Sequence, residues 1–233
     1  MPRAKNIFRV VCAAAFITAG FLFAGCVVVS KIGNPEYDAF RENRPVSILV
    51  LPPLNNSLDV DAPNVILASS VKPLAESGYY VIPVALSMQM FAQNGIQTAF
   101  DAHAVPHRML REIFGADAAL YITITRFGSS FQLLRSVVQV EASARLVDLR
   151  SGQELWKGNI YYEEEPSKTN INAGGGFGLQ LLAAIGSAII DQVSNDLSNA
   201  SYDVGSSAMN TFLTAERSNG ILFGPYNPNY ETD

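Results

Sequence analysis

Alternation of apolar and polar residues predicts a β-strand between Val138 and Leu146. Apolar side chains occupy every second position of this stretch, and polar side chains occupy the positions between them. Successive side chains of a strand point to opposite faces of a sheet, so one face is expected to be buried and the other solvated. We therefore expect Val140 and Ala144 to be buried, and Glu141 and Arg145 to be exposed.

The chain before this strand is predicted to contain a parallel strand pair joined by a helix. Residues 46–53 form a short apolar run that ends in a Pro-Pro pair, which indicates a buried strand. Apolar residues recur at helical spacing over residues 65–75, with Gly78 as a stop signal, although Pro73 is expected to disturb this helix. Residues 79–84 predict a second strand, and the order strand–helix–strand favours parallel pairing.

The remaining apolar patterns predict further elements. Short helices are expected at 85–95 and 104–115, strands at 118–128 and 154–162, helices at 177–200 and 201–218, and an irregular tail at 219–233. Gly152 lies in a tight turn that favours a positive φ. The expected fold class is α/β, with a mixed sheet of about five strands, helices packed on it, and C-terminal helices.

The amino terminus has the pattern of a secretory signal. Arg3, Lys5 and Arg9 precede an uncharged, mostly apolar stretch at 10–25. A membrane-spanning helix needs about 20 apolar residues, and this stretch is shorter. The pattern therefore favours a signal peptide over a membrane span.

Cys26 directly follows this apolar stretch. The preceding residues, Phe23, Ala24 and Gly25, resemble the lipobox of bacterial lipoproteins, although phenylalanine stands where leucine is usual. The resemblance implies that the Cys26 thiol receives a diacylglycerol, that a signal peptidase cuts before it, and that the new amine is acylated, for example with palmitate. The alternative is a cleaved signal peptide or an uncleaved anchor in which Cys26 is incidental.

The lipobox resemblance sets the expected domain organisation. Residues 1–25 are expected to form a lipoprotein signal peptide, residues 26–44 a lipidated tether, and residues 45–233 a single α/β domain with C-terminal helices and an irregular tail. Cys12 falls in the discarded segment, so the mature chain is expected to form no intramolecular disulfide. In the sorting rule of this class, aspartate after the cysteine retains a lipoprotein in the inner membrane. Val27 therefore implies the outer membrane, on its periplasmic side.

The charge balance argues against nucleic acid as a partner. The chain carries 16 Lys and Arg residues against 21 Asp and Glu residues, and removal of the signal peptide leaves 13 against 21, a net charge of −8. No Lys or Arg cluster stands out in the sequence. A nucleic-acid surface needs such a cluster to displace phosphate counterions. An anionic lipid surface is disfavoured for the same reason.

No set of residues in the sequence predicts catalysis or metal binding. His103 and His107 are the only histidines, but Pro106 marks a helix start between them and the glutamate of the zincin motif is missing. We interpret both histidines, with the nearby Asp101, as polar residues at a helix start. The Gly-Ser-Ser sequences lack the nucleophile-elbow pattern. We expect no catalytic residue, no metal and no cofactor apart from the lipid on Cys26.

An interaction surface is predicted in the C-terminal part of the chain. Residues 177–190 are uncharged and apolar around most of a helical circumference, which is unusual for an isolated surface helix and too short to span a bilayer. Burial against another chain, most simply a second copy, burial against the outer membrane, and burial in the domain's own core all remain open. Tyrosines at 161, 162, 226 and 230 could stack on sugars or pack as ordinary aromatics. The candidate interaction residues are Leu179, Ala183, Gly186, Ile190, Tyr226 and Tyr230.

Four stretches of the mature chain resemble a known family. They are SILVLPP at 47–53, FGADAALYITIT at 114–125, ARLVDLRSGQELWKG at 144–158 and GILFGPYNPNY at 220–230. They are similar to Gram-negative lipoproteins that are grouped as a domain of unknown function. The resemblance implies a fold similar to the N-terminal domain of the periplasmic Tol translocation protein, to the curli secretion lipoprotein and to the lipoprotein activator of peptidoglycan synthases.

These resemblances lead to a functional expectation. We expect a non-enzymatic outer-membrane lipoprotein that faces the periplasm and acts as an accessory or scaffold in envelope transport or secretion assembly. The alternative is a lipoprotein that binds the cell wall or regulates a peptidoglycan synthase. The expected partners are the membrane, through the lipid anchor, and a second copy or another envelope protein.

Overall fold

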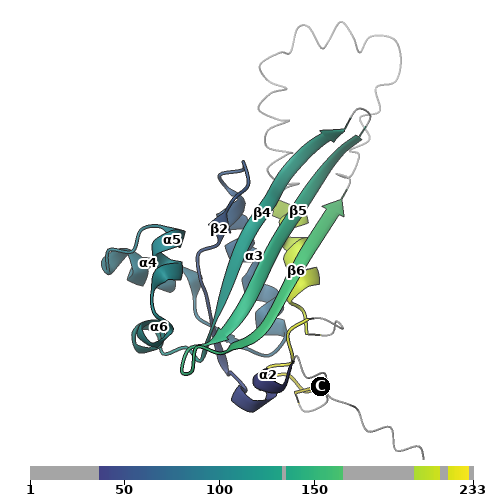
Figure 1. The fold of residues 1–233 in the computed structure, drawn as a ribbon. Helices are drawn as coiled ribbons and strands as arrows, with labels where there is room; N and C mark the ends of the chain where they lie inside the picture. The colour runs from purple at the N-terminus through teal and green to yellow at the C-terminus, as the bar shows by residue number, and fades with distance from the viewer. Residues whose placement is uncertain (1–36, 133–134, 165–201, 216–219, 231–233) are drawn as a thin grey trace, which may run out of the picture. The chain divides into compact units, whose positions relative to one another are not determined.

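One mixed sheet organises the fold (Figure 1). The computed structural model describes residues 37–132, 135–164, 202–215 and 220–230, all within the compact unit Pro35–Asp233. The strands follow the order β3-β1-β4-β5-β6, and β2 pairs with β4 beyond the end of β1. Their bounds are β1 Ser47–Val50, β2 Leu54–Asn55, β3 Tyr80–Val81, β4 Ala118–Gln132, β5 Arg135–Asp148 and β6 Glu154–Glu164.

The helices pack on this sheet, so the predicted α/β class is confirmed. Their bounds are α2 Asp38–Asn43, α3 Ala62–Glu76, α4 Val84–Gln93, α5 Ala99–Ala104 and α6 His107–Phe114, and a further helix occupies 202–213. Strand β1 pairs in parallel with β3 and β4, whereas β4, β5 and β6 pair in antiparallel fashion. Because α3 lies between β1 and β3 in the chain, the predicted strand–helix–strand unit is confirmed.

Helix α3 tolerates two prolines for different reasons. Pro63 lies in its first turn, where the missing N–H removes no helical hydrogen bond. Pro73 lies inside the helix and leaves one such bond unmade, yet the helix continues to Glu76. Gly78 follows with a φ of 94°, a conformation that favours glycine and ends the helix as the sequence predicts.

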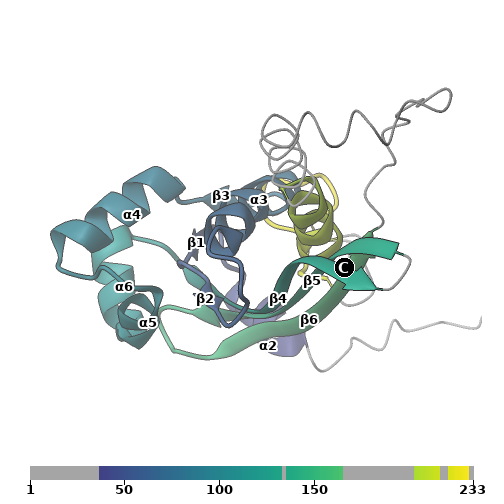
Figure 2. The same cartoon turned by 90° about the horizontal axis from the view of Figure 1, so that it is seen from above.

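The two faces of the sheet carry separate apolar cores. On one face, Leu120, Ile122 and Ile124 are fully buried in a cluster with residues of α2, α3 and the 202–213 helix. On the other face, a smaller cluster joins the sheet to α4, α5 and α6. Figure 2 shows these three helices grouped apart from α3 and the 202–213 helix.

The alternation predicted for β5 is confirmed. Val140 and Ala144 are buried, Arg145 is exposed and Glu141 is half-exposed. The side chains of the register partners Val140 and Phe127 both join the larger core. Phe127 reaches that face because a β-bulge at Thr125 shifts the register between Ile124 and Arg126.

Helix α2 corrects the predicted start of the folded domain. Residues 26–44 were expected to form a tether, but Tyr37 and Phe40 are 7% and 3% exposed and belong to the larger core. The Tyr37 hydroxyl also donates a hydrogen bond of 2.7 Å to the carbonyl oxygen of Gly220. The fold therefore includes α2, which precedes the predicted boundary at residue 45.

The predicted helix and irregular tail of the C-terminal part are confirmed within the residues that the structure describes. Residues 202–213 are helical and bury Ala208, Met209 and Leu213, and residues 220–230 form turns without helix or strand. The predicted helix at 177–197 lies outside the described residues. None of the described helices has the length and apolar character needed to cross a membrane.

Candidate functional site

A groove of about 530 Å³ lies on the face of the sheet that carries α4, α5 and α6. These helices cover the sheet around Ala119 and Tyr121, and β4, β5 and β6 extend past them in Figure 1. Among the described residues, no helix covers this face beyond Tyr121. The groove begins where the helices stop.

Two rows of side chains form the floor of the groove. Tyr121, Arg145 and Lys157 are register partners on β4, β5 and β6. Two residues further along the strands, Thr123, Ser143 and Asn159 form the next row. Because side chains two residues apart on a strand share a face, both rows face the groove.

Arg145 is held against an aromatic ring. Its guanidinium carbon lies 4.4 Å from the centre of the Tyr121 ring, a cation–π arrangement. Tyr121 is only 7% exposed, and burial raises the pKa of its hydroxyl, an effect that the charge of Arg145 partly opposes. The phenol therefore stays protonated at neutral pH.

His103 and Leu54 form the wall of the groove. The ring of His103 meets the ring of Tyr121 edge-on, with 5.1 Å between centres. Its Nε2 lies 2.9 Å from the carbonyl oxygen of Pro52. A carbonyl only accepts hydrogen bonds, so Nε2 carries the proton and Nδ1 is the acceptor of the neutral ring. Burial lowers the pKa of His103, and Arg145 adds to this, while the Pro52 bond opposes it.

The cations in the groove outnumber its carboxylates. Lys157 Nζ lies 3.9 Å from Oε1 of Glu154, but both side chains are well exposed, so solvent screens this pair. Arg145 has no carboxylate partner among the described residues. With His103 neutral, the groove carries two positive charges and one negative charge.

The two histidines occupy different surroundings. His103 lies in the last turn of α5 and faces Tyr121, whereas His107 begins α6 and packs against the turn at Gly152. Pro106 precedes α6, as predicted, but His103 ends a helix that the sequence did not predict. Within the described ranges, no group of three or more His, Cys, Asp and Glu side chains could hold a metal ion.

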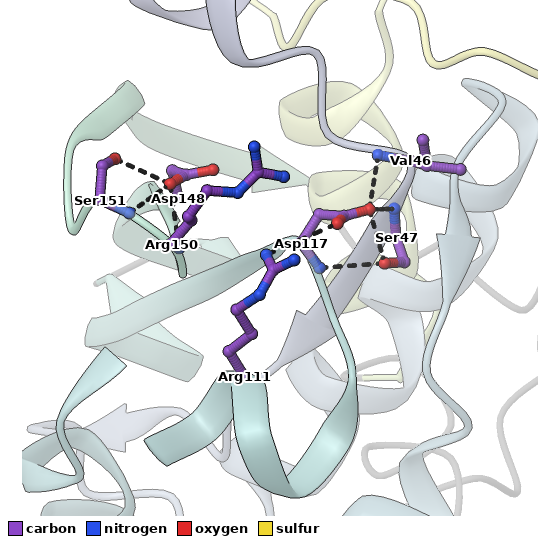
Figure 3. A network of polar contacts seen from close by, with 7 residues as sticks. All are labelled: Val46, Ser47, Arg111, Asp117, Asp148, Arg150 and Ser151. Carbon is purple, nitrogen blue, oxygen red and sulfur yellow. Dashed lines mark hydrogen bonds and ion pairs between the residues drawn. The ribbon is translucent and has the colours of Figure 1, made fainter. Parts of the chain in front are cut away.

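Two aspartates form hydrogen bonds at the end of the sheet where β4 begins and β5 ends (Figure 3). Oδ2 of Asp117 accepts hydrogen bonds from the amides of Val46 and Ser47 and from the Ser47 hydroxyl, at 3.0–3.2 Å. Arg111 Nη1 lies 3.8 Å from its other oxygen. These bonds tie the start of β1 to the start of β4, which is a structural role.

Asp148 organises the turn between β5 and β6. Its Oδ1 accepts hydrogen bonds from the amides of Arg150 and Ser151 and from the Ser151 hydroxyl, at 2.6–3.0 Å. Gly152 follows with the predicted positive φ, here 80°. No pattern in the sequence singles out Asp117 or Asp148, although both lie in stretches that resemble the lipoprotein family.

The predicted interaction residues are only partly described. Cys26, Leu179, Ala183, Gly186 and Ile190 lie outside the described residues. Tyr226 is 71% exposed, and Tyr230 is half-buried with its ring 5.6 Å from the guanidinium of Arg44. The two tyrosines are near in sequence but differ in their surroundings.

The fold and groove define a mixed α/β domain with one partly open sheet face. Residues 35–226 match the model of a family described as "Putative lipoprotein GNA1162-like", and the chain belongs to this family. The chain is 44% identical over 207 residues to the "Putative lipoprotein NMB1124/NMB1162" of Neisseria meningitidis serogroup B, covering 89% of this chain and 93% of that protein.

A solved structure from the same family agrees with this assignment. The crystal structure of lipoprotein GNA1162 from Neisseria meningitidis is 48% identical, with a TM-score of 0.50, and covers 65% of this chain and 99% of that chain. A PelC dodecamer from Paraburkholderia phytofirmans is 12% identical, with a TM-score of 0.39, and covers 72% of this chain and 86% of that chain. The predicted lipoprotein family is confirmed. The similarity to the Tol and curli proteins stays a prediction.

Proposed function

We infer that this protein is a lipid-anchored, non-enzymatic lipoprotein of the outer membrane that faces the periplasm and serves as an accessory or scaffold in envelope transport or secretion. The observation that carries this proposal is the groove on β4, β5 and β6, a recess with a polar floor on the sheet. A sheet positions side chains more rigidly than loops do, which suits it to hold a partner.

Membership of the lipoprotein family and the amino-terminal sequence support the proposed location. The lipobox-like residues before Cys26 supply a site for acylation, and Val27 favours the outer membrane. Each buried methylene of an acyl chain contributes about 0.8 kcal/mol to membrane binding, and two or more chains hold a protein stably. The domain then needs no membrane span of its own.

The chemistry of the groove supports binding rather than catalysis. A general base must lie within hydrogen-bond reach of the group that it activates. His103 uses Nε2 for the Pro52 carbonyl, and within the described ranges no hydrogen bond joins it to a hydroxyl. Ser143, the serine of the groove, has no side-chain partner among the described residues.

A cell-wall role is the second candidate function, and Tyr161 favours it. This residue lies two positions after Asn159 on β6 and is 57% exposed. A tyrosine ring beside polar side chains combines an apolar face with a polar tip, which suits contact with sugars. A lipoprotein that binds the wall, or that regulates a peptidoglycan synthase, would use the same sheet face.

Lipidation and location are tested together by Cys26→Ala. We expect the wild-type protein to incorporate labelled palmitate and to sediment with outer-membrane vesicles in a density gradient. The variant should lose the label and either become soluble or remain as uncleaved precursor. Label retained by Cys26→Ala would contradict lipidation at this residue, and sedimentation of the wild type with the inner membrane would contradict the proposed location.

The partner class is tested by photo-cross-linking in cells. A cross-linking amino acid placed at Asn159, in the groove, is compared with one at Lys72, which is exposed on α3. We expect position 159 to capture a component of an envelope transport assembly and position 72 not to capture it. Capture of a peptidoglycan synthase, or of wall fragments, from position 159 would favour the second candidate instead.

Self-association through residues 177–197 remains part of the proposal. Leu179, Ala183 and Ile190 lie on a different side of the predicted helix from Ile185 and Ile189, so one domain cannot easily cover both sides. Exposed apolar patches of this kind favour association. We expect Leu179→Glu combined with Ile190→Glu to convert a dimer of the mature, lipid-free chain to a monomer in analytical ultracentrifugation. A monomeric wild type at high concentration would contradict self-association.

A further inference from the structure

The groove contains a pair of like charges that folding alone does not explain. Arg145 and Lys157 are direct register partners on the antiparallel strands β5 and β6. Like charges directly opposite each other destabilise a sheet. The chain as a whole is acidic, with a net charge of −5, so adjacent cations are not a consequence of composition. The position of the pair in a recess suggests that it meets an anion.

Arg145 is arranged to present its donors. Its guanidinium carbon lies over the Tyr121 ring, and among the described residues no hydrogen bond engages its N–H groups, so these groups can donate to a ligand. Tyr121 is fixed in turn by burial and by the edge-on contact with His103. The Arg145 side chain therefore loses part of its conformational entropy when the protein folds, and less is lost when a ligand binds.

The neighbouring row offers hydrogen bonds to a second part of the ligand. Thr123, Ser143 and Asn159 have no side-chain partner among the described residues. Their row lies two residues along the strands from Arg145 and Lys157, or about 7 Å. One residue of an extended peptide spans about 3.5 Å, so the row lies within reach of the amide groups next to a carboxylate.

We propose that this groove binds a peptide through a free carboxylate, with Arg145 and Lys157 on the carboxylate and the Thr123 row on the adjacent amides. Leu54, on the wall, contacts an apolar part of the peptide. Asn159 both donates and accepts hydrogen bonds, which matches an amide better than a phosphate ester. A bidentate guanidinium–carboxylate contact adds geometric selectivity that a lysine alone does not supply.

The proposal is tested by titrating the full mature lipoprotein, labelled with ¹⁵N in detergent micelles, with two peptides. The probe is N-acetyl-trialanine with a free carboxylate, and its matched control is the same peptide with a carboxamide end. We expect the acid to bind at least about tenfold more tightly than the amide, because a charge-assisted hydrogen bond is lost in the amide. The backbone amides of Ser143 and Lys157 should shift on binding.

Matched variants test whether Arg145 and Lys157 bind the carboxylate of the peptide. Arg145→Gln and Lys157→Gln should each weaken acid binding by roughly fivefold or more, and added salt should weaken it further. Arg126→Gln is the control, because Arg126 pairs with Glu141 at 3.3 Å and does not line the groove. It should leave binding within about twofold of wild type. Lys157 is largely exposed, so its variant reports on binding without a folding defect.

Three results would overturn the proposal. They are equal binding of the acid and the amide, an absence of shifts at the groove, and binding of inorganic phosphate as tightly as the acid peptide. This assignment deepens the proposed function, since it rests on the groove as a binding site. Its failure would leave the location and cross-linking experiments unaffected, so the two claims fail separately.

Discussion

The two faces of β4 show how one strand can serve both folding and binding. Ile122 and Ile124 are fully buried under α3 and the 202–213 helix, whereas Thr123, between them, is half-buried and Thr125 is exposed. The covered face is apolar from Ala118 to Phe127. The other face is apolar only where α4, α5 and α6 cover it. The polar part of a sheet face therefore marks where the domain's own helices stop.

The first prediction tests this difference with adjacent residues. Ile122→Ala should lower the free energy of unfolding by about 2–5 kcal/mol, because it removes buried methyl groups and leaves a cavity. Thr123→Ala, one residue away on the groove side, should change it by less than about 0.5 kcal/mol. Chemical denaturation of both variants measures the two values. Similar losses would mean that the groove face is packed as tightly as the core.

A close backbone contact should give the next largest effect. A Cβ atom on Gly224 would contact the carbonyl oxygen of Gly78, and backbone cannot rotate away as a side chain can. Gly224→Ala should therefore cost about 1–3 kcal/mol, as overpacked sites do, and should loosen the tail that closes the covered face. Gly224 has no positive φ, so the contact with Gly78 is the expected source of the loss. A loss below about 0.5 kcal/mol in Gly224→Ala, measured by chemical denaturation, would contradict the packing argument.

Removal of one charge at the end of the sheet should have a smaller effect. Asp117→Asn keeps the shape of the side chain but weakens three hydrogen bonds, which come from Ser47 at the start of β1 and from Val46 just before it. We expect a loss of about 1–2 kcal/mol and faster hydrogen exchange at the amide of Ser47. Ser151→Ala, which removes one bond to Asp148 in the neighbouring turn, should cost less. An unchanged exchange rate at Ser47 would show that Asp117 does not fix β1.

The sequence predicted regular elements well where the apolar period was long. The two-residue alternation in β5 and the helical spacing in α3 each repeat several times along the sequence, and both are confirmed. Strand β2 has two residues and α5 has six, which is too short for a period to be recognised. Helix α2 was assigned to the tether because few apolar residues, chiefly Tyr37 and Phe40, carry its contact with the core.

The groove could not be predicted because it depends on a bulge. Leu146 pairs with Trp156, but the next residue, Val147, pairs with Glu154, so Leu155 is an extra residue in β6. A hairpin without this bulge would place Trp156 opposite Arg145. The bulge places Lys157 there instead and creates the pair of cations. Neither the bulge nor the position of α5, which supplies His103, has a recognisable signal in one sequence.

The smallest predicted effect is a pH dependence of stability that arises from His103 at the groove wall. Burial, assisted by Arg145, lowers the pKa of His103 below its ordinary value of 6.5. The unfolded chain therefore binds a proton more readily than the folded protein, so stability falls as the pH drops below about 6.5 and is complete above it. Proton NMR should show the His103 ring titrating below 6.5, with Arg145→Gln moving the pKa upward while burial still holds it low. His103→Gln should reduce the loss of stability between about pH 7.5 and pH 5.5 in urea denaturation. A ring that titrates at or above 6.5 would mean that His103 is solvated and that the groove lacks this wall.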